Sequence, residues 1–169
     1  MSATDCIRVT TVVATDPASA FDLFTREVDA WWRRGPRFRQ GLGRPSVMRF
    51  EGAEGGRLLE IYSDDAGGSF EVGRILAWKP ADRLVFEWRG YNFEPDLVTE
   101  VEVRFERAEG GTRVTLEHRG WDRVPLGHGV RHGYGASNAF TSMIGLWWGD
   151  LLTSLRAHAR GRPLTTKPS

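Results

Sequence analysis

His118 and Glu60 are the two side chains whose chemistry and expected position single them out. Alternation along a predicted strand places His118 on the same face as Val114 and Leu116, the face that we assign to the interior. A buried histidine usually has a hydrogen-bond partner and then orients the sheet, but it can also contact a polar group of a ligand or move a proton. Glu60 lies in a strand that is apolar on both faces. It is therefore either a buried carboxylate able to act as a general base or one more exposed acid.

Together, His118 and Glu60 form the one acid–base pair that the sequence offers for catalysis. A cyclase or dehydratase needs an acid and a base placed around its substrate. The other acids of the predicted strands alternate onto the wet face: Glu87, Glu100, Glu102 and Glu117. Any catalysis is therefore assigned to His118 and Glu60, although we expect a binding protein rather than an enzyme.

Aromatic side chains dominate the expected interior. The sequence has seven tryptophans, each of which buries a large area and needs a partner for its indole N–H. An apolar cavity with few polar anchors is the usual form of a small-molecule site. We predict such a ligand-binding cavity, lined by His118 and by Tyr62, Trp78, Trp88, Phe105, Trp121, Phe140, Ile144, Trp147 and Trp148. If these side chains interdigitate fully, they form an ordinary core instead.

The motifs give no support for metal or cofactor chemistry. His128 and His132 are four residues apart, a spacing that would bring both to one face of a helix. The glycines beside them oppose a helix, however, and no third ligand is evident. The sequence contains no phosphate-binding loop, nucleophile elbow or paired cysteines. We predict no metal and no cofactor, and interpret the glycine-rich stretch 127–135 as either a lid over the cavity or a plain connector.

Charge and cysteine content restrict the partners and the compartment. Twenty-three Lys and Arg against twenty-two Asp and Glu leave a formal net charge of +1 in 169 residues. This balance gives no electrostatic reason to expect nucleic acid or an anionic membrane as a partner. Cys6 is the one cysteine, so no disulfide forms within the chain, and a cytoplasmic location is the simplest expectation. We expect no signal peptide and no membrane-spanning segment.

Period-two alternation predicts seven strands. The first, Ile7–Ala14, is separated from the others by a helical region. The other six follow one another with short turns between them: Val47–Phe50, Arg57–Tyr62, Phe70–Trp78, Arg83–Trp88, Val98–Phe105 and Thr112–His118. Short connections favour an antiparallel meander over parallel strands with crossover helices.

Three helices are expected. Asp16, followed by proline, marks the start of the first, and the second ends before Pro36. The third, from about Ser137 to Ala159, would be roughly 33 Å long and carries one apolar, aromatic arc. The apolar face of the sheet is the one large surface that can cover this arc. The order of elements therefore predicts an α+β domain.

Several segments form a specific combination of motifs. They are Gly55–Arg57 with Glu60, Gly73–Pro80, Arg83–Trp88, Thr99–Val103, Gly111–Val114 and Glu117–Trp121. Together they resemble the START-like (SRPBCC) helix-grip superfamily, and within it the stand-alone bacterial form of the branch named after activators of the heat-shock protein 90 ATPase. The resemblance implies a curved antiparallel sheet, with two short helices after the first strand, wrapped around a long C-terminal helix. We expect this domain at 1–160 and a flexible tail at 161–169.

The superfamily contains carriers, cyclases and chaperone cofactors, so the fold alone does not select a function. Our first hypothesis is that the chain binds a small hydrophobic molecule, including an aromatic one, without a cofactor. The second is a polyketide cyclase-like or dehydratase-like enzyme that uses the same cavity. The third is a protein-interaction module, either linked to a chaperone or self-associating as a homodimer through a sheet edge or an aromatic patch.

Overall fold

The computed structural model describes residues 6–161, and its helices and strands follow the predicted order. Every predicted strand and helix is present, with bounds within a few residues of those expected. The elements are β1 (Cys6–Val13), α1 (Pro17–Thr25), α2 (Val28–Trp31), β2 (Ser46–Phe50), β3 (Arg57–Tyr62), β4 (Ser69–Lys79), β5 (Arg83–Trp88), β6 (Thr99–Ala108), β7 (Gly111–Arg119) and α3 (Asn138–Arg160), with short 3-10 turns at Trp121–Arg123 and Gly129–Arg131. Apart from Gly161, the predicted tail lies outside the described residues.

One antiparallel sheet contains the strands in the order β1-β7-β6-β5-β4-β3-β2. The strands from β2 to β7 form the predicted meander, and β1 pairs with β7. Ile7 lies opposite His118, and Val9 lies opposite Leu116. Because side chains alternate along a strand, His118 shares a face with Leu116 and Val114, and all three are buried. The predicted inward position of His118 is confirmed.

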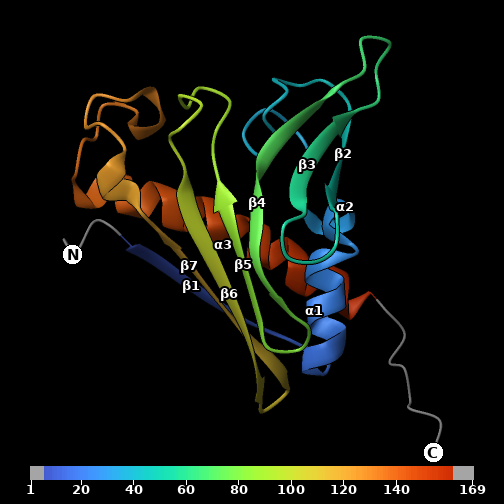
Figure 1. Ribbon diagram of the computed structural model, residues 1–169. Helices are drawn as coiled ribbons and strands as arrows, with labels where there is room; N and C mark the ends of the chain where they lie inside the picture. The colour runs from blue at the N-terminus through green and yellow to red at the C-terminus, as the bar shows by residue number, and fades with distance from the viewer. Residues whose placement is uncertain (1–5, 162–169) are drawn as a thin grey trace, which may run out of the picture.

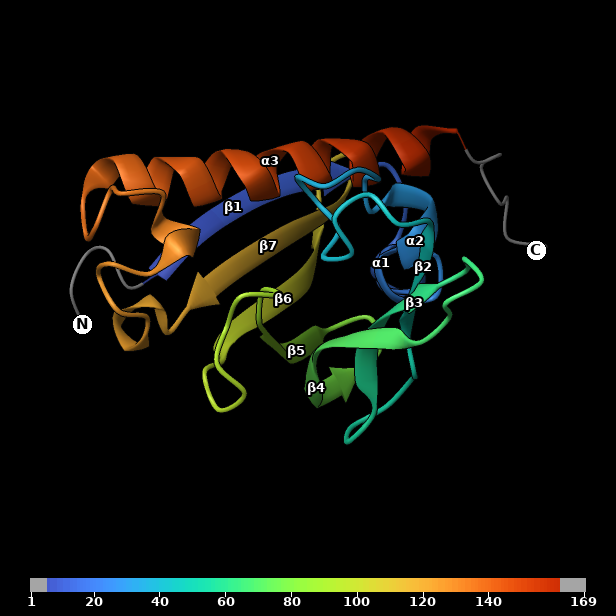
Figure 2. The same ribbon diagram turned by 90° about the horizontal axis from the view of Figure 1, so that it is seen from above.

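The sheet curls where β4 pairs with β5. The pairing of these strands shifts register between Ile75 and Ala77, which marks a β-bulge. At Gly73 the two backbones come so close that a Cβ would overlap the carbonyl group of Glu87. Figure 2 shows the consequence: α3 lies along β1 and β7, and the sheet curls away from it toward β4 and β3.

Helix α1 fills the interior at the end where the β4–β5 and β6–β7 hairpins turn (Figure 1). Asp16 caps this helix as predicted, because its carboxylate accepts a hydrogen bond from the backbone N–H of Ser19 at 2.8 Å. Phe21 packs against Trp78 and Phe105, with ring centroids 5.2 Å away in both cases. This end of the interior is therefore packed core.

Helix α3 covers the sheet with the apolar arc predicted for it. Its buried residues are Phe140, Ile144, Trp148, Leu151, Leu152, Leu155 and Ala159. They recur mainly at intervals of three or four, so one stripe of the helix faces the sheet. The chain has the α+β helix-grip architecture that the sequence predicts. No helix between residues 6 and 161 is long and apolar enough to cross a membrane.

Candidate functional site

The interior contains a cavity of about 360 Å³, and none of the residues that line it belongs to α1. Its buried end is formed by Trp88 at the end of β5, by His118 of β7 and by Trp121 just beyond β7. Its outer end is formed by three connections: the 32–45 loop, the 89–98 loop and the 120–137 segment. Met143, Ile144 and Trp147 of α3 complete the wall. A fixed strand framework thus supplies the buried end, and loops supply the outer end.

The wall of this cavity carries little charge. Among the described residues that line it there is no aspartate or glutamate, and Arg37 is the one side chain with a permanent charge. The Arg37 guanidinium lies at the outer end and forms an ion pair with Asp150 of α3, with an N–O distance of 2.7 Å. Cavities of roughly 300–1,000 Å³ with mostly apolar walls are typical small-molecule sites.

His118 is held between two neighbours in one protonation state. The indole N–H of Trp148 can only donate, so His118 Nδ1 accepts this hydrogen bond, which is 2.9 Å long. His118 Nε2 therefore carries the ring proton and donates a hydrogen bond to Thr99 Oγ1 at 2.6 Å. The Thr99 hydroxyl in turn donates to the carbonyl oxygen of Trp88 at 3.0 Å. Full burial lowers the pKa of His118 from 6.5 to about 3, so the imidazole is neutral and neither nitrogen is free.

Aromatic rings pack around this histidine. The ring centroid of His118 lies 4.5 Å from that of Trp121 and 5.2 Å from that of Trp88. Trp88 and Trp147 approach each other with centroids 6.0 Å apart. These spacings are those of edge-to-face and tilted aromatic pairs, which pack rigidly. The buried end of the cavity is therefore a preformed aromatic surface.

Hydrogen bonds tie the connections together at the outer end. The indole N–H of Trp147 donates to the carbonyl oxygen of Arg37 at 2.7 Å and so joins α3 to the 32–45 loop. The side-chain oxygen of Gln40 accepts from the backbone N–H of Tyr91 at 2.7 Å, which joins this loop to the 89–98 loop. These bonds lie at the surface, where water can replace them. The outer end is therefore held by surface hydrogen bonds that do not involve the sheet.

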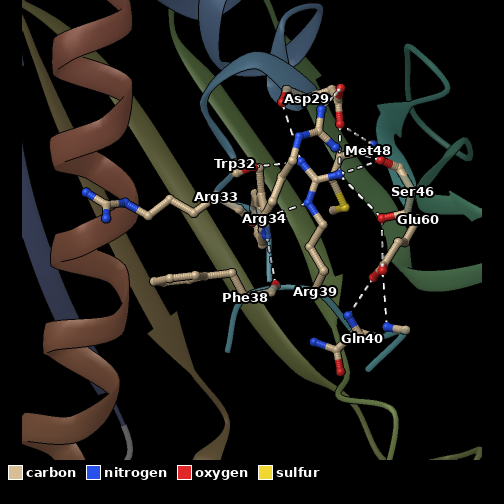
Figure 3. Close-up of polar contacts among 11 residues, drawn as sticks. Asp29, Trp32, Arg33, Arg34, Phe38, Arg39, Gln40, Ser46, Met48 and Glu60 are labelled. Atoms are coloured by element: carbon tan, nitrogen blue, oxygen red, sulfur yellow. Dashed lines mark hydrogen bonds and ion pairs between the residues drawn. The ribbon is translucent and has the colours of Figure 1, made fainter. Parts of the chain in front are cut away.

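A buried polar cluster fixes the 32–45 loop from behind (Figure 3). We call Asp29, Arg39, Ser46 and Glu60 the Arg39 cluster. Arg39 is only 4% exposed and donates to Asp29 Oδ1 at 2.9 Å and to the carbonyl oxygen of Ser46 at 2.8 Å. Glu60 accepts from the backbone N–H groups of Gln40 at 2.7 Å and Gly41 at 3.1 Å. The cluster therefore anchors the loop whose other side lines the cavity.

Burial and pairing shift the pKa values in the Arg39 cluster. Burial lowers the pKa of Arg39, and the neighbouring Asp29 opposes this shift. For Asp29, burial acts to raise the pKa. The backbone N–H of Met48, 2.9 Å from the carboxylate, and the Arg39 guanidinium outweigh burial and leave the pKa of Asp29 below its usual value. The pair is therefore ionised at neutral pH.

The structure divides the predicted ligand-binding residues into two groups. Those that line the cavity are Trp88, His118, Trp121, Ile144 and Trp147. Those that lie elsewhere are Tyr62, Trp78, Phe105, Phe140 and Trp148. Trp78 and Phe105 pack under α1, and Phe140 and Trp148 belong to the core beneath α3. The Arg44 guanidinium carbon lies over the ring of Tyr62, 3.9 Å from the ring centroid.

The catalytic hypothesis meets a geometric obstacle. Glu60 is buried, as one of its two predicted orientations required, but it does not line the cavity. Its carboxylate oxygens accept hydrogen bonds from two backbone amides and from the Ser46 hydroxyl at 3.2 Å. His118 does line the cavity, but both of its nitrogens are occupied. The two candidates are not brought together around one space.

Several lining residues carry no signal in the sequence. Arg37, Gln40 and Leu42 belong to the 32–45 loop, and Tyr91 belongs to the 89–98 loop. Loop residues follow no period, so alternation cannot assign them to a face. Leu42 and Tyr91 are large apolar side chains that remain exposed beside the cavity. Exposed apolar residues are visible only once the fold is known.

The structure also places the two histidines that were considered as metal ligands. His128 Nδ1 accepts from the backbone N–H of Val130 at 3.1 Å, and Nε2 contacts the carbonyl oxygen of Asn92 at 3.1 Å. His132 lines the outer end of the cavity. Between residues 6 and 161, no group of three or more His, Cys, Asp or Glu side chains is arranged to hold a metal ion. His128 thus links the 120–137 segment to the 89–98 loop.

Comparison with known families places the chain. Residues 14–145 match the family described as Activator of Hsp90 ATPase homolog 1-like protein. The chain belongs to this family. The match runs from α1 through β7 into the first turns of α3 and includes the strands and loops that form most of the cavity wall. Among curated proteins, none matches the chain.

Solved structures agree with the fold of the Activator of Hsp90 ATPase homolog 1-like family. Protein MLL2253 from Mesorhizobium loti is 18% identical, with a TM-score of 0.61 over 94% of this chain and 99% of that one. The Aha1 dimer from Colwellia psychrerythraea is 16% identical, with a TM-score of 0.60 over 91% and 95%. CalU16 from Micromonospora echinospora is 20% identical, with a TM-score of 0.57 over 95% and 77%. Identities this low establish the shared fold and no shared activity.

Proposed function

We propose that this protein binds a small hydrophobic ligand in the cavity between the sheet and α3. The observation that carries the proposal is the cavity itself: about 360 Å³, with an aromatic buried end and an outer end bordered by loops. An ordinary core would be packed to crystal-like density at both ends and would leave no cavity of this size. Burial of an apolar ligand here would contribute roughly 25 cal/mol for each Å² removed from water.

Binding is a better account than catalysis. Catalysis of the cyclase or dehydratase kind needs a proton donor and acceptor that reach the substrate. Glu60 lies outside the cavity, and the neutral His118 is committed to Trp148 and Thr99. We therefore leave enzymatic turnover out of the proposal.

A cavity-filling variant tests the proposal. N-phenyl-1-naphthylamine, a neutral probe that fluoresces in apolar surroundings, should bind the wild-type protein saturably. Met143→Trp adds bulk to a residue that lines the cavity and should lower the affinity for the probe at least tenfold. Leu146→Trp is the matched control, because Leu146 lies on the same helix, is 67% exposed and does not line the cavity.

Thermal unfolding of both variants verifies that each is folded. Equal loss of affinity in the two variants would place the probe on the surface of α3 and not in the cavity. If the folded wild-type protein shows no saturable binding of this probe or of other neutral hydrophobic compounds, the proposed function is wrong.

Self-association is a second proposal, supported by the relative from Colwellia psychrerythraea that is described as an Aha1 dimer. Light scattering of the purified protein should give the mass of two chains at high concentration. The mass of one chain at every concentration would contradict this proposal and would leave ligand binding untouched.

A further inference from the structure

We infer that the ligand is an uncharged aromatic molecule with a hydrogen-bond acceptor, such as a ketone oxygen, and that the indole N–H groups of Trp88 and Trp121 recognise this acceptor. The inference rests on the proposed function and adds the chemical class of the ligand. Both tryptophans line the buried end of the cavity, and their ring centroids lie 6.0 Å apart.

The two indole N–H groups are buried donors without a partner. Among the described residues, the buried side-chain nitrogen and oxygen atoms that lack a hydrogen bond are Trp88 Nε1, Trp121 Nε1 and Arg89 Nε. Trp88 is 6% exposed and Trp121 is 0% exposed, so bulk water does not serve these donors. Native proteins leave few buried donors unpaired, because each loses its hydrogen bond to water without replacement. Both unpaired donors belong to residues that line the cavity, and each therefore needs a specific explanation.

Four other tryptophans of this chain have a hydrogen-bond acceptor for the indole N–H. The N–H of Trp31 donates to the carbonyl oxygen of Leu23, and that of Trp32 to Phe38. Trp147 donates to the carbonyl oxygen of Arg37, and Trp148 to His118 Nδ1. The fold thus supplies acceptors for these four indoles. The two buried indole N–H groups that lack an acceptor belong to Trp88 and Trp121, which both line the buried end of the cavity. A ligand there can supply the acceptor.

The ligand should bring an acceptor and not a donor. At the buried end, His118 is the lining side chain that carries an acceptor, and its Nδ1 already accepts from Trp148. A hydroxyl hydrogen on the ligand would find this side-chain acceptor already in use. A ketone oxygen has two lone pairs and can accept from one or both indoles after a small adjustment of the side chains around them.

The ligand should also be uncharged. No carboxylate is present in the described wall to pair with a cation, and His118 is neutral. Arg37 is the one cationic side chain with a permanent charge, but it lies at the outer end and already pairs with Asp150. An ion at the buried end would lose its hydration without gaining a counter-charge, which is strongly unfavourable.

Shape and volume complete the description. The rings of Trp88, Trp121 and Trp147 present flat surfaces against which an aromatic system can pack. About 360 Å³ is near the lower limit for small-molecule pockets and suits about two or three rings better than a long lipid chain.

Three compounds with one skeleton test the inference by displacement of N-phenyl-1-naphthylamine. They are 2-acetonaphthone, which carries a ketone; 2-ethylnaphthalene, in which a methylene replaces the carbonyl; and 2-naphthoate, an anion. In the wild-type protein the ketone should bind at least tenfold more tightly than the anion. This comparison needs no variant and so does not depend on the folding of one.

Conservative variants then assign the donors. Trp88→Phe or Trp121→Phe removes an unpaired N–H and should lower the ratio of ketone affinity to ethyl affinity about threefold to tenfold. Trp147→Phe is the matched control, because it removes a similar ring area from the same wall while its N–H is committed to Arg37. In this control the two affinities should fall together and the ratio should stay constant.

The outcomes separate this inference from the proposed function. If the ratio is the same in the wild-type protein and in both Trp88→Phe and Trp121→Phe, the indoles recognise no acceptor and the inference fails, although binding stands. If 2-naphthoate binds as tightly as the ketone, the ligand class is wrong. If no compound binds saturably, the proposed function itself fails.

Discussion

His118 illustrates why the identity of a residue does not determine its role. Its position on the inner face follows from simple alternation, but its chemistry is set by Trp148 and Thr99, which come from α3 and β6. An imidazole with a donor on one nitrogen and an acceptor on the other is fixed in one tautomer. His118 therefore joins the helix to the sheet beneath the cavity. It is better suited to support aromatic walls than to exchange protons.

The first prediction concerns pH and stability. Burial lowers the pKa of His118 to about 3 in the folded protein, whereas the unfolded chain titrates near 6.5. Between these values only the unfolded state binds the proton, so the free energy of unfolding falls as the pH is lowered. The contribution is fully present above pH 6.5 and is lost toward pH 3, by up to about 1.4 kcal/mol per pH unit.

Urea unfolding at pH 7 and pH 5 measures this effect. His118→Gln keeps a donor and an acceptor but does not titrate, so it should remove about 2 kcal/mol of the difference between the two pH values. Identical pH dependence in the wild-type protein and in this variant would mean that His118 is not held neutral by burial.

At the scale of elements, the 32–45 loop forms one border of the outer end of the cavity. The Arg39 cluster anchors the loop on one side, and Arg37 and Gln40 meet α3 and the 89–98 loop on the other. Glu60 is central, because its carboxylate accepts from two consecutive loop amides, at Gln40 and Gly41. A carboxylate in this position replaces the partners that a regular strand or helix would give those amides.

Replacement of this carboxylate should loosen the loop. Glu60→Gln exchanges one acceptor oxygen for an amide donor that faces the loop N–H groups, so it should destabilise the protein by about 1–3 kcal/mol. Hydrogen exchange at Gln40 and Gly41, followed by NMR, should become faster. Glu106→Gln, at an exposed position of β6, is the control and should change neither quantity. Unchanged exchange in Glu60→Gln would show that the loop does not depend on the carboxylate.

The elements themselves could be predicted from the sequence because their signals are local. Alternation in β6 and β7, the Asp16 cap and the apolar arc of α3 each depend on residues close together in the chain. The hydrogen-bond partners of Glu60 could not be predicted, because they lie about twenty residues away in the chain. Gln40 and Gly41 lie in a loop without a period, so neither the orientation of Glu60 nor its partners could be read from spacing.

At the scale of the whole molecule, the position of the cavity depends on which end of the curled sheet is covered by α1. Trp78 and Phe105 alternate inward much as Trp88 does, yet Phe21 of α1 packs against both. Trp88 is the last residue of β5. This end of the strands lies away from α1, and loops border it (Figure 1). Alternation predicts the inner face of a strand but not which end of that face a helix will fill. For this reason Trp88 and Trp121 could be anticipated at the cavity, while Trp78 and Phe105 were misplaced there.

The most direct test of ligand binding in this cavity is an indole ¹H–¹⁵N NMR titration with N-phenyl-1-naphthylamine. The sequence has seven tryptophans, and conservative Trp→Phe variants assign their seven N–H signals. We predict saturable shifts for Trp88, Trp121 and Trp147, with Trp31 and Trp78 at the α1 end unchanged. Uniform shifts that do not saturate, or shifts confined to Trp31 and Trp78, would contradict a binding site between the sheet and α3.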